Sequence, residues 1–280
     1  MDDNHRVKIS ACLVVYNEAT IIRRCLQSIQ GIVDEIIVVH DGPCADATLT
    51  IAQEFNARVF ERAHIGEAEE HRVFAMKQAT GEWILQIDAD EFFSSEDGVS
   101  IRSIIEQTSY GIDAYALRWE MWDGKKAIHI IGMDKPCFFR RARAHFFGVP
   151  HETIFVDGDK KNIAIVLHHR PMYNNIAWKS FWRKAHKWIP IHAEYFFDEK
   201  IKTLECFNTT ADQWRQRALF VRAHGMRYVL WEPLKMMLGQ LKNGLWRSVV
   251  GVTISVQQYV YYLLLYRLVW KKNRQQKSRS

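Results

Sequence analysis

This chain of 280 residues lacks closely spaced pairs of cysteines. The five cysteines are odd in number, scattered, and never spaced as Cys-X-X-Cys; they are Cys12, Cys25, Cys44, Cys137 and Cys206. This pattern argues against a disulfide framework and a structural zinc site, and it indicates a reducing compartment. The N-terminal residues are polar and lack the apolar core of a secretory signal, so we expect a cytoplasmic location.

Glycine-rich phosphate loops are missing as well. No Gly-X-Gly-X-X-Gly follows the first apolar run, and no Gly-X-X-X-X-Gly-Lys-Ser/Thr occurs in the sequence. These two sequences carry the usual dinucleotide binding and P-loop nucleotide hydrolysis, so their absence argues against both functions. A nucleotide would have to be held by carboxylates and a metal ion instead.

Acidic residues are missing from the C-terminal part of the chain. After Glu232 there is no Asp or Glu, and the same stretch contains nine Lys and Arg residues. The net charge of +6 therefore comes from this tail, and the residues before it carry a net charge of −3. A uniformly basic nucleic-acid-binding surface is not indicated, and we expect no nucleic-acid partner.

The same tail has a long uncharged run. The 19 residues between Arg247 and Arg267 carry no charge, which approaches the ~20 apolar residues of a membrane span. Four tyrosines in the run and the flanking Trp246 and Trp270 suit a membrane interface, and the basic residues suit anionic headgroups. We predict that residues 231–280 form helices on the inner face of the cytoplasmic membrane. A true span, or packing on the remaining chain or a partner subunit, is the alternative.

The sequence is organised around a short apolar run that ends in three carboxylates. Trp83 to Ile87 is nearly all apolar, as is typical of a buried parallel strand, and Asp88, Asp90 and Glu91 follow. Two carboxylates one residue apart at a strand end would repel each other unless they share a cation. A divalent metal suits them, because Mg²⁺ typically binds one or two carboxylates plus substrate phosphates. A solvated acidic turn is the alternative, so the surrounding chain has to decide.

Alternating strands and helices precede this run. In order, the expected elements are a strand over 8–16, a helix over 19–30, a strand over 35–39, a helix over 46–55, a strand over 57–61, a helix over 67–79 and a strand over 83–88. Asn17 and Asp46 are the expected caps of the first two helices. Helix-length crossovers imply parallel pairing with right-handed connections, so the predicted fold is α/β with a mainly parallel sheet flanked by helices.

Three of these strands end in polar clusters, and such ends lie at one edge of a parallel sheet. The clusters are Asn17-Glu18, His40-Asp41-Gly42 and Asp88-Ala89-Asp90. Their convergence, more than any single motif, predicts a functional site at this edge.

At these residues the chain resembles family 2 glycosyltransferases of the GT-A fold, particularly members that extend the lipopolysaccharide core or similar glycans. The runs that carry the resemblance are ISACLVVYNEATIIRRCLQSI, DEIIVVHDGPCADATLTIA and QATGEWILQIDADE. The likeness covers roughly residues 8–95 strongly and 96–170 more loosely. It implies a Rossmann-like GT-A domain over 1–230, with a nucleotide-sugar half at about 8–95 and an acceptor half at about 96–230, followed by a helical membrane-associating extension over 231–280.

The resemblance also implies a pocket for a nucleotide sugar, UDP-linked, and a metal ion, Mn²⁺ or Mg²⁺. It places the metal at Asp90, with Asp88 toward the ribose or sugar, and it places an acidic nucleobase contact at Asp41. One departure is that the family often has Asp-Asp-Gly-Ser-Thr-Asp after the second strand, where this chain has His40 and one extra residue. The residues expected to contact the nucleotide sugar are Tyr16, Asn17, Glu18, Asp41, Arg72, Asp88, Ala89, Asp90 and Arg140.

Two of these residues have alternative interpretations. Arg72, on the helix before the central strand, could face the diphosphate or be a solvated helix charge. Arg140, with the neighbouring Arg141, could bind phosphate on the donor or an anionic acceptor, or could lie on the surface.

The acceptor side is expected in the later region of the chain. The segment FRRARAHFFGVPHE resembles an Arg-rich segment ending in His-Glu in the same relatives, which makes Glu152 the candidate general base. A glutamate with its ordinary pKa of ~4.3 is ionised at neutral pH and can accept a proton. Glu152 could instead brace a loop, and Glu91 is the rival base. His168, after an expected strand over 162–167, is the candidate third metal ligand; a packed or surface histidine is the alternative, and His151 could also serve.

The sequence therefore predicts a metal-dependent, inverting glycosyltransferase that moves a sugar to a lipid-linked or glycan acceptor. The enzyme-class alternative is another metal-dependent nucleotide-sugar enzyme, such as a nucleotidyltransferase, which would need a Gly-rich, basic loop directly after the first strand. The non-enzymatic alternative is a membrane-attached nucleotide-sugar-binding protein that has lost catalysis. The presence of Asp88, Asp90 and Glu152 favours the enzyme.

Overall fold

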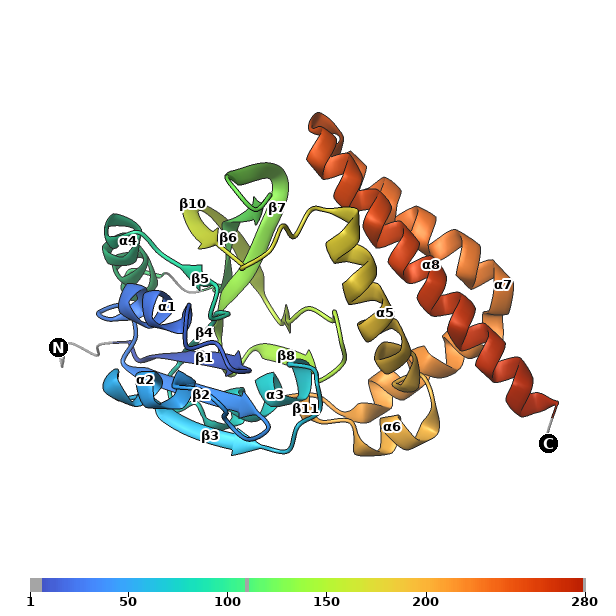
Figure 1. The fold of residues 1–280 in the computed structure, drawn as a ribbon, viewed down its shortest axis with the longest axis horizontal. Helices are drawn as coiled ribbons and strands as arrows, with labels where there is room; N and C mark the ends of the chain where they lie inside the picture. The colour runs from blue at the N-terminus through green and yellow to red at the C-terminus, as the bar shows by residue number, and fades with distance from the viewer. Residues whose placement is uncertain (1–6, 109–110, 279–280) are drawn as a thin grey trace. The chain divides into compact units, whose positions relative to one another are not determined.

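The computed structural model describes residues 7–108 and 111–278, apart from the side chain of Met226, and the chain divides into two compact units (Figure 1). The sheet unit comprises Met1–Glu120, Asp134–Arg170 and Glu205–Thr209, and the helical unit comprises Met121–Met133, Pro171–Leu204 and Thr210–Ser280.

The sheet unit consists of strands joined by short helices. Its strands are β1 (Ile9–Val15), β2 (Glu35–Asp41), β3 (Arg58–Arg62), β4 (Trp83–Gln86), β5 (Glu91–Phe92), β6 (Ile112–Trp122), β7 (Ala127–Arg140), β8 (Ala144–Phe147), β9 (Phe155–Val156), β10 (Asp159–His169) and β11 (Cys206–Phe207). Its helices are α1 (Ile22–Ile29), α2 (Thr48–Glu54), α3 (Glu69–Gln78) and α4 (Ser95–Glu106). β6 and β7 continue into the helical unit.

The large sheet has the strand order β3-β2-β1-β4-β7-β6-β10-β5. β1 pairs in parallel with β2 and β4, β2 with β3, and β6 with β10. β7 runs antiparallel to β4, and β5 runs antiparallel to β10. A smaller sheet has the order β11-β8-β9. The mainly parallel α/β fold predicted from the sequence is confirmed.

The order of the first four strands places a ligand site. The chain passes from β1 to β2 and β3 on one side and then returns to β4 on the other side of β1. In open α/β sheets, ligands bind beyond the carboxyl ends of the strands at such a switch point. The residues that follow β1 and β4 therefore stand where a ligand is expected.

Side chains of the central strands alternate between two apolar cores. On β1, Leu13 packs in the core that includes α1, α2 and α4, whereas Cys12 packs in the core that includes α3. Val38 and Val39 divide in the same way on β2. Strands covered on both faces read as continuous apolar runs, which explains the sequence pattern. Each such side chain, fully buried, contributes about 1.5–3 kcal/mol, and together they hold the sheet edge in place.

The first helix begins later than expected. α1 starts at Ile22 rather than Ala19, and its N-cap residue is Ile21. Asn17 therefore does not cap this helix. It adopts a left-handed backbone conformation (φ 52°) and donates its N–H to His40 Nε2 over 3.1 Å.

Two other boundaries are also shifted. α2 begins at Thr48 rather than at residue 46. Asp46 lies two residues before the helix, and its Oδ1 accepts a hydrogen bond from the Thr48 N–H (2.9 Å). β4 ends at Gln86, two residues before the expected end. Asp88 consequently belongs to the loop beyond the sheet.

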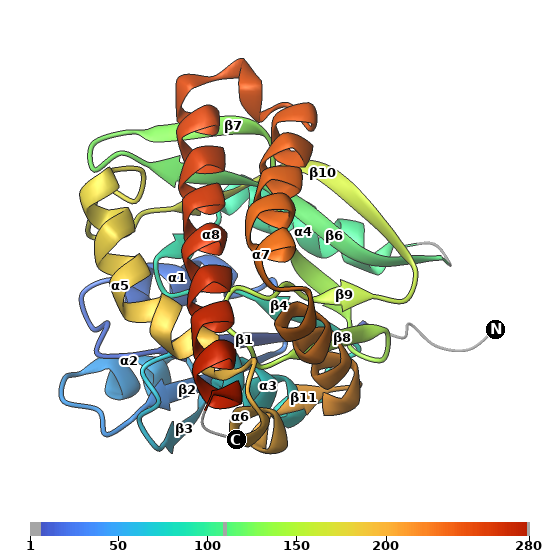
Figure 2. The same cartoon turned by 90° about the vertical axis from the view of Figure 1, so that its right-hand side faces the viewer.

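The helical unit is dominated by long helices. They are α5 (Trp178–Glu194), α6 (Asp198–Thr203), α7 (Ala211–Lys242), the 3-10 helix η1 (Leu245–Arg247) and α8 (Val249–Lys277). α7 and α8 lie side by side (Figure 2), and the rings of Tyr228 and Tyr266 meet edge to face with centroids 4.9 Å apart. The domain boundary expected at 230/231 falls in the middle of α7.

α8 is apolar and long enough to cross a membrane, judged by length and composition within the described chain. Of its apolar window, 39% is buried inside the protein, and Leu265 and Val269 are fully covered. A core helix of a protein in water passes the same test, so the helix is only weak support for contact with a membrane.

Glu35, at the start of β2, is expected to stabilise the sheet unit in its ionised form. Its carboxylate accepts hydrogen bonds from Ser10 Oγ (2.6 Å), Thr80 N–H (2.9 Å) and Arg58 Nη1 (2.7 Å). Burial alone would raise the pKa of Glu35, but these hydrogen bonds lower it to about 2. The stabilisation is therefore complete above the unfolded pKa of ~4.3 and is lost as the pH falls from there to about 2.

Glu35→Gln should lower the free energy of unfolding near neutral pH by about 1–2 kcal/mol, less than the full shift because solvent reaches part of the carboxylate. The deficit relative to the wild type should shrink in acid, since the wild type loses the same interaction there. Urea unfolding at neutral and acidic pH measures both values. Glu54→Gln, which removes an exposed ion pair with Arg23, is the control. The prediction would be contradicted if Glu54→Gln lowered the free energy of unfolding equally, or if the loss in Glu35→Gln were the same at neutral and acidic pH.

Candidate active site at the carboxyl edge of the sheet

The loops after β1 and β4 bring three carboxylates together. Glu18 follows β1, and Asp88 and Asp90 follow β4. Because β1 and β4 pair in parallel, with Cys12 opposite Gln86, both loops leave the sheet at the same edge. The Glu18 carboxyl responds to its neighbours: burial first, and then the charges of Asp90 and Asp88, raise its pKa to about 8. The carboxylates expected to converge thus lie close enough to interact.

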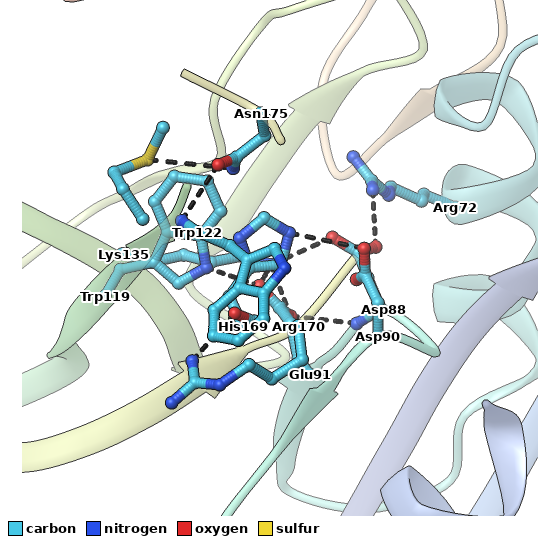
Figure 3. Close-up of polar contacts among 11 residues, drawn as sticks. Arg72, Asp88, Asp90, Glu91, Trp119, Trp122, Lys135, His169, Arg170 and Asn175 are labelled. Atoms are coloured by element: carbon cyan, nitrogen blue, oxygen red, sulfur yellow. Dashed lines mark hydrogen bonds and ion pairs between the residues drawn. The ribbon is translucent and has the colours of Figure 1, made fainter. Parts of the chain in front are cut away.

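Asp88 is paired with two cations (Figure 3). Its Oδ1 accepts from Arg72 Nη2 (2.6 Å), and its Oδ2 accepts from Lys135 Nζ (3.0 Å). Burial opposes ionisation, but Arg72 and Lys135 outweigh it and hold the pKa of Asp88 below its ordinary value. Of the two interpretations of Arg72, the structure favours a place at the site, because its side chain is only 20% exposed and bonded to Asp88.

Glu91 is an internal anchor of this arrangement. Its side chain is 0% exposed, and both oxygens accept from Lys135 Nζ (2.7 and 2.6 Å). Trp119 Nε1 (2.7 Å) and the backbone N–H of Asp88 (2.9 Å) donate to the same carboxylate. A general base has to reach the proton that it removes, which a covered carboxylate with these four contacts does not do. The covered position of Glu91 therefore argues against the prediction that it is the rival base.

Asp90 lies beside an imidazole, although not the expected one. Asp90 Oδ2 is 3.2 Å from His169 Nε2, and the His169 ring stacks on Trp119 with centroids 4.6 Å apart. His168 has a different partner, because its Nδ1 is 2.8 Å from Glu120 Oε2. Successive side chains on a strand point to opposite faces, so only one of two adjacent histidines on β10 can face Asp90. His169, rather than His168, is therefore the imidazole beside Asp90.

Arg140 lies at the other end of β4. It pairs across the sheet with Trp83, the first residue of that strand, and forms ion pairs with Glu82 and with Asp113 (3.4 Å). At about 3.3 Å per strand residue, β4 alone separates this end from the loop of Asp88 by roughly 10 Å. Arg140 thus forms ion pairs at the opposite end of β4, which argues against the predicted contact with the donor.

An exposed aromatic ring follows β1. Tyr16 is 53% exposed and lies beside His40 and His64, with ring centroids 5.8 and 5.1 Å away. His40 is itself buried: its Nε2 accepts the Asn17 N–H, so its Nδ1 carries the proton and donates to the Gly42 carbonyl (2.6 Å). The histidine that departs from the family sequence thus joins the loops after β1 and β2.

Asp41 is buried and bonded to the loop after β3. Its Oδ1 accepts from Ile65 N–H (2.6 Å) and lies 2.9 Å from His71 Nε2, and its Oδ2 accepts from Gly66 N–H (2.9 Å). Burial would raise its pKa, but these bonds hold the pKa of Asp41 below its ordinary value. A nucleobase contact at Asp41 would have to use the lone pairs that remain.

Two further expected residues, Ala89 and Glu152, lie in loops. Ala89, between the two aspartates, is 3% exposed and belongs to the apolar core of β1 and β4. Glu152 lies in the loop between β8 and β9, is partly exposed, and donates its backbone N–H to the Val149 carbonyl (3.2 Å). His151 precedes it in a left-handed conformation (φ 62°). Glu152 is thus a partly exposed loop residue, in contrast to the covered Glu91.

Lys135, His169 and Trp119 belong to the site although the sequence did not indicate them. Lys135 lies on β7, and a single lysine in a strand without simple alternation carries no motif. His169 is selected by the register of β10 against β5, in which His169 lies opposite Glu91. The His-His dipeptide was a signal for an imidazole, but it could not identify which of the two.

The donor set fits a divalent metal ion that has few protein ligands. Residues 7–108 and 111–278 contain no group of three His, Cys, Asp or Glu side chains placed to hold a metal. Burial first, and then the negative charges of Asp90 and Asp88, raise the pKa of Glu18, so repulsion between these carboxylates persists despite the cations on Asp88. A cation at Asp90 would relieve that repulsion. A carboxylate oxygen and the His169 nitrogen suit Mn²⁺ or Mg²⁺, with phosphates and water as the remaining ligands.

Comparison with known proteins gives a sequence family, relatives and similar solved structures. The sequence model of glycosyl transferase family 2 matches residues 10–156. An uncharacterized glycosyltransferase of Rickettsia felis is 42% identical over 89 residues, which cover 32% of this chain and 31% of that protein. The putative glycosyltransferase EpsH of Bacillus subtilis is 33% identical over 121 residues, which cover 40% of this chain and 35% of that protein. The match thus spans about a third of the length of these relatives.

Among solved structures, residues 1–349 of S. aureus TarS are similar over 96% of this chain and 91% of that chain, with 16% identity and a TM-score of 0.46. Glucosyl-3-phosphoglycerate synthase from Mycobacterium tuberculosis, crystallised with Mn²⁺ and UDP, is similar over 40% of this chain and 44% of that chain, with 22% identity and a TM-score of 0.34. Because the family model covers more than half of its residues, this chain belongs to glycosyl transferase family 2.

Proposed function

We propose that the chain is a metal-dependent, inverting glycosyltransferase that moves a sugar from a UDP-linked donor to a lipid-linked or glycan acceptor. The observation that carries the proposal is the arrangement at the switch point, where Asp88 is paired with Arg72 and Lys135 while Asp90 lies beside His169. Membership of family 2 supports sugar transfer as the reaction. The acceptor would be met at the inner face of the cytoplasmic membrane.

In this proposal, the residues around Asp88 and Asp90 bind the metal and the diphosphate part of the donor. Asp90 and His169 would hold the metal, which when bound neutralises charge on the departing diphosphate. Arg72 and Lys135 keep Asp88 ionised, so that its oxygens remain acceptors for a ribose or sugar hydroxyl. Arg72 adds a positive charge beside the expected position of the diphosphate.

The nucleobase and the acceptor would be handled by other loops. Tyr16 offers an exposed ring on which a base can stack, with Asp41 and the loop that it anchors close to the same sheet edge. Glu152 would take the proton of the acceptor hydroxyl while the hydroxyl oxygen attacks the anomeric carbon. Attack from the side opposite the diphosphate inverts the configuration at that carbon.

Asp90→Ala is expected to abolish metal-dependent donor binding, because it removes the proposed carboxylate ligand. Titration calorimetry of UDP with and without Mn²⁺ measures the effect. Glu54→Ala, on the exposed face of α2, is the control and should bind like the wild type. An unchanged Mn²⁺-dependent affinity in the Asp90 variant would refute the metal position.

The two adjacent histidines allow a matched comparison. His169→Ala should weaken Mn²⁺-dependent UDP binding by at least about 10-fold, the lower range for losing a residue around a metal. His168→Ala should change it much less, because that ring is bonded to Glu120. The same calorimetric titration measures both variants, and the opposite ranking would return the ligand role to His168.

Glu152→Gln is expected to leave UDP affinity unchanged and to lower turnover by about 10²–10⁴-fold, the usual contribution of a general base. A thermal-shift screen of UDP-sugars with Mn²⁺ identifies the donor, since a ligand of the folded state raises its apparent stability. Release of UDP from that donor then gives the rate. Turnover near that of the wild type would assign the base role to another residue.

A further inference from the structure

The exposed side of the second half of α7 is apolar. Gly225 interrupts the helix (φ 48°, ψ −130°), and beyond this break Leu230, Trp231 and Leu238 are 55%, 58% and 52% exposed. Leu230, Leu234 and Leu238 are spaced four residues apart, so they share one helix face. The outward face of a helix on a protein in water is normally polar. This exposed apolar face therefore indicates a surface that binds another molecule.

The other side of the same half-helix is covered by α8. Tyr228 meets Tyr266 edge to face, Gln240 donates a hydrogen bond to Gln258, and Val229 is 3% exposed. Figure 2 shows the two helices lying side by side along this half. The helix thus has two apolar sides, one that packs inside the helical unit and one that is bare.

More exposed apolar side chains follow at the turn between α7 and α8. Trp246, Val249 and Val252 are 62%, 84% and 39% exposed, and with Trp178 they line a groove of about 460 Å³. The exposed apolar residues of this half of α7 are here termed the docking surface: Leu230, Trp231 and Leu238.

Positive charge is interleaved with these residues. Arg227, Lys235, Lys242 and Arg247 are all exposed, and the chain has no Asp or Glu after Glu232. Lysine is depleted at protein–protein interfaces. Tryptophan beside lysine and arginine is instead the composition of helices that lie at the surface of anionic membranes. The charge therefore favours a lipid surface over a protein partner.

The long apolar helix α8 packs inside the helical unit. Its Tyr262, Leu265, Tyr266 and Val269 are buried within the helical unit. Insertion of α8 across a bilayer would remove these contacts, whereas contact through the docking surface leaves them intact.

We propose that the docking surface binds an anionic lipid bilayer, with the second half of α7 lying among the headgroups and α8 remaining packed behind it. The proposal concerns the helical unit alone and goes beyond the transfer reaction. It names the surface that would hold the enzyme near a lipid-linked acceptor.

The test is co-sedimentation of the full chain with phosphatidylcholine vesicles, with and without phosphatidylglycerol. The wild type should bind the vesicles that contain phosphatidylglycerol, and salt should weaken this binding because it screens the basic side chains. The double variant Trp231→Glu, Leu238→Glu should reduce the partition coefficient by at least about 10-fold, because it removes two apolar contacts and adds two negative charges. Both positions are exposed, so the helical unit should stay folded, which a thermal melt verifies.

Val99→Glu is the matched control, because Val99 on α4 is 76% exposed and lies in the sheet unit. It should bind vesicles like the wild type. Failure of the wild type to bind anionic vesicles, or an equal loss in Val99→Glu, would overturn the proposal. Self-association of the wild type that the double variant abolishes, without any change in vesicle binding, would assign the surface to a second copy of the chain. Mn²⁺-dependent UDP binding in lipid-free buffer reports on the donor site separately.

Discussion

One largely buried ammonium group, that of Lys135, organises the edge of the sheet. Lys135 Nζ lies within 3.0 Å of both Asp88 and Glu91, and it reaches them from β7, more than forty residues further along the chain. Carboxylates this close together would otherwise repel each other and take up protons. Removing one partner of a buried ion pair typically costs about 3–5 kcal/mol, because the other charge is left uncompensated. The acidic loop after β4 therefore depends for its charge compensation on Lys135 of β7, a strand that lies outside the Asp88-Ala89-Asp90 sequence.

The acidic residues at this edge of the sheet fall into two pairs that differ in their partners. Asp88 and Glu91 are held by cations inside the protein, so their charges are compensated before any ligand binds. Asp90 instead lies beside His169, and the pKa of Glu18 is raised to about 8, first by burial and then by the charges of Asp90 and Asp88. An incoming cation would gain most at the second pair. A motif of adjacent acids can thus contain both scaffold and ligand, and only their partners distinguish the two.

The sequence was sufficient for the fold and for the convergence of the strand ends, but not for the contacts that the side chains make there. Parallel β1 to β4 follow from apolar runs and crossover lengths, and the strand ends locate Glu18, Asp88 and Asp90. Which of His168 and His169 faces Asp90 depends on the register of β10 against β5, and a shift of one residue exchanges them. The position of Arg140 could not be predicted for a similar reason, because β7 runs antiparallel to β4 and brings Arg140 to Trp83. Lys135 has no local signal, since its role arises from contacts distant in sequence.

The path of the chain between its two units also has a practical meaning. The backbone passes from one unit to the other five times, and β6 and β7 each have residues in both. No single cut therefore yields either unit as a continuous polypeptide. A truncation near residue 232 would sever α7 and discard α8, whose Leu265 and Val269 fill the interior of the helical unit. Shortened versions of this protein would consequently report on misfolding rather than on the role of the part removed, so point substitutions on exposed faces are the informative changes.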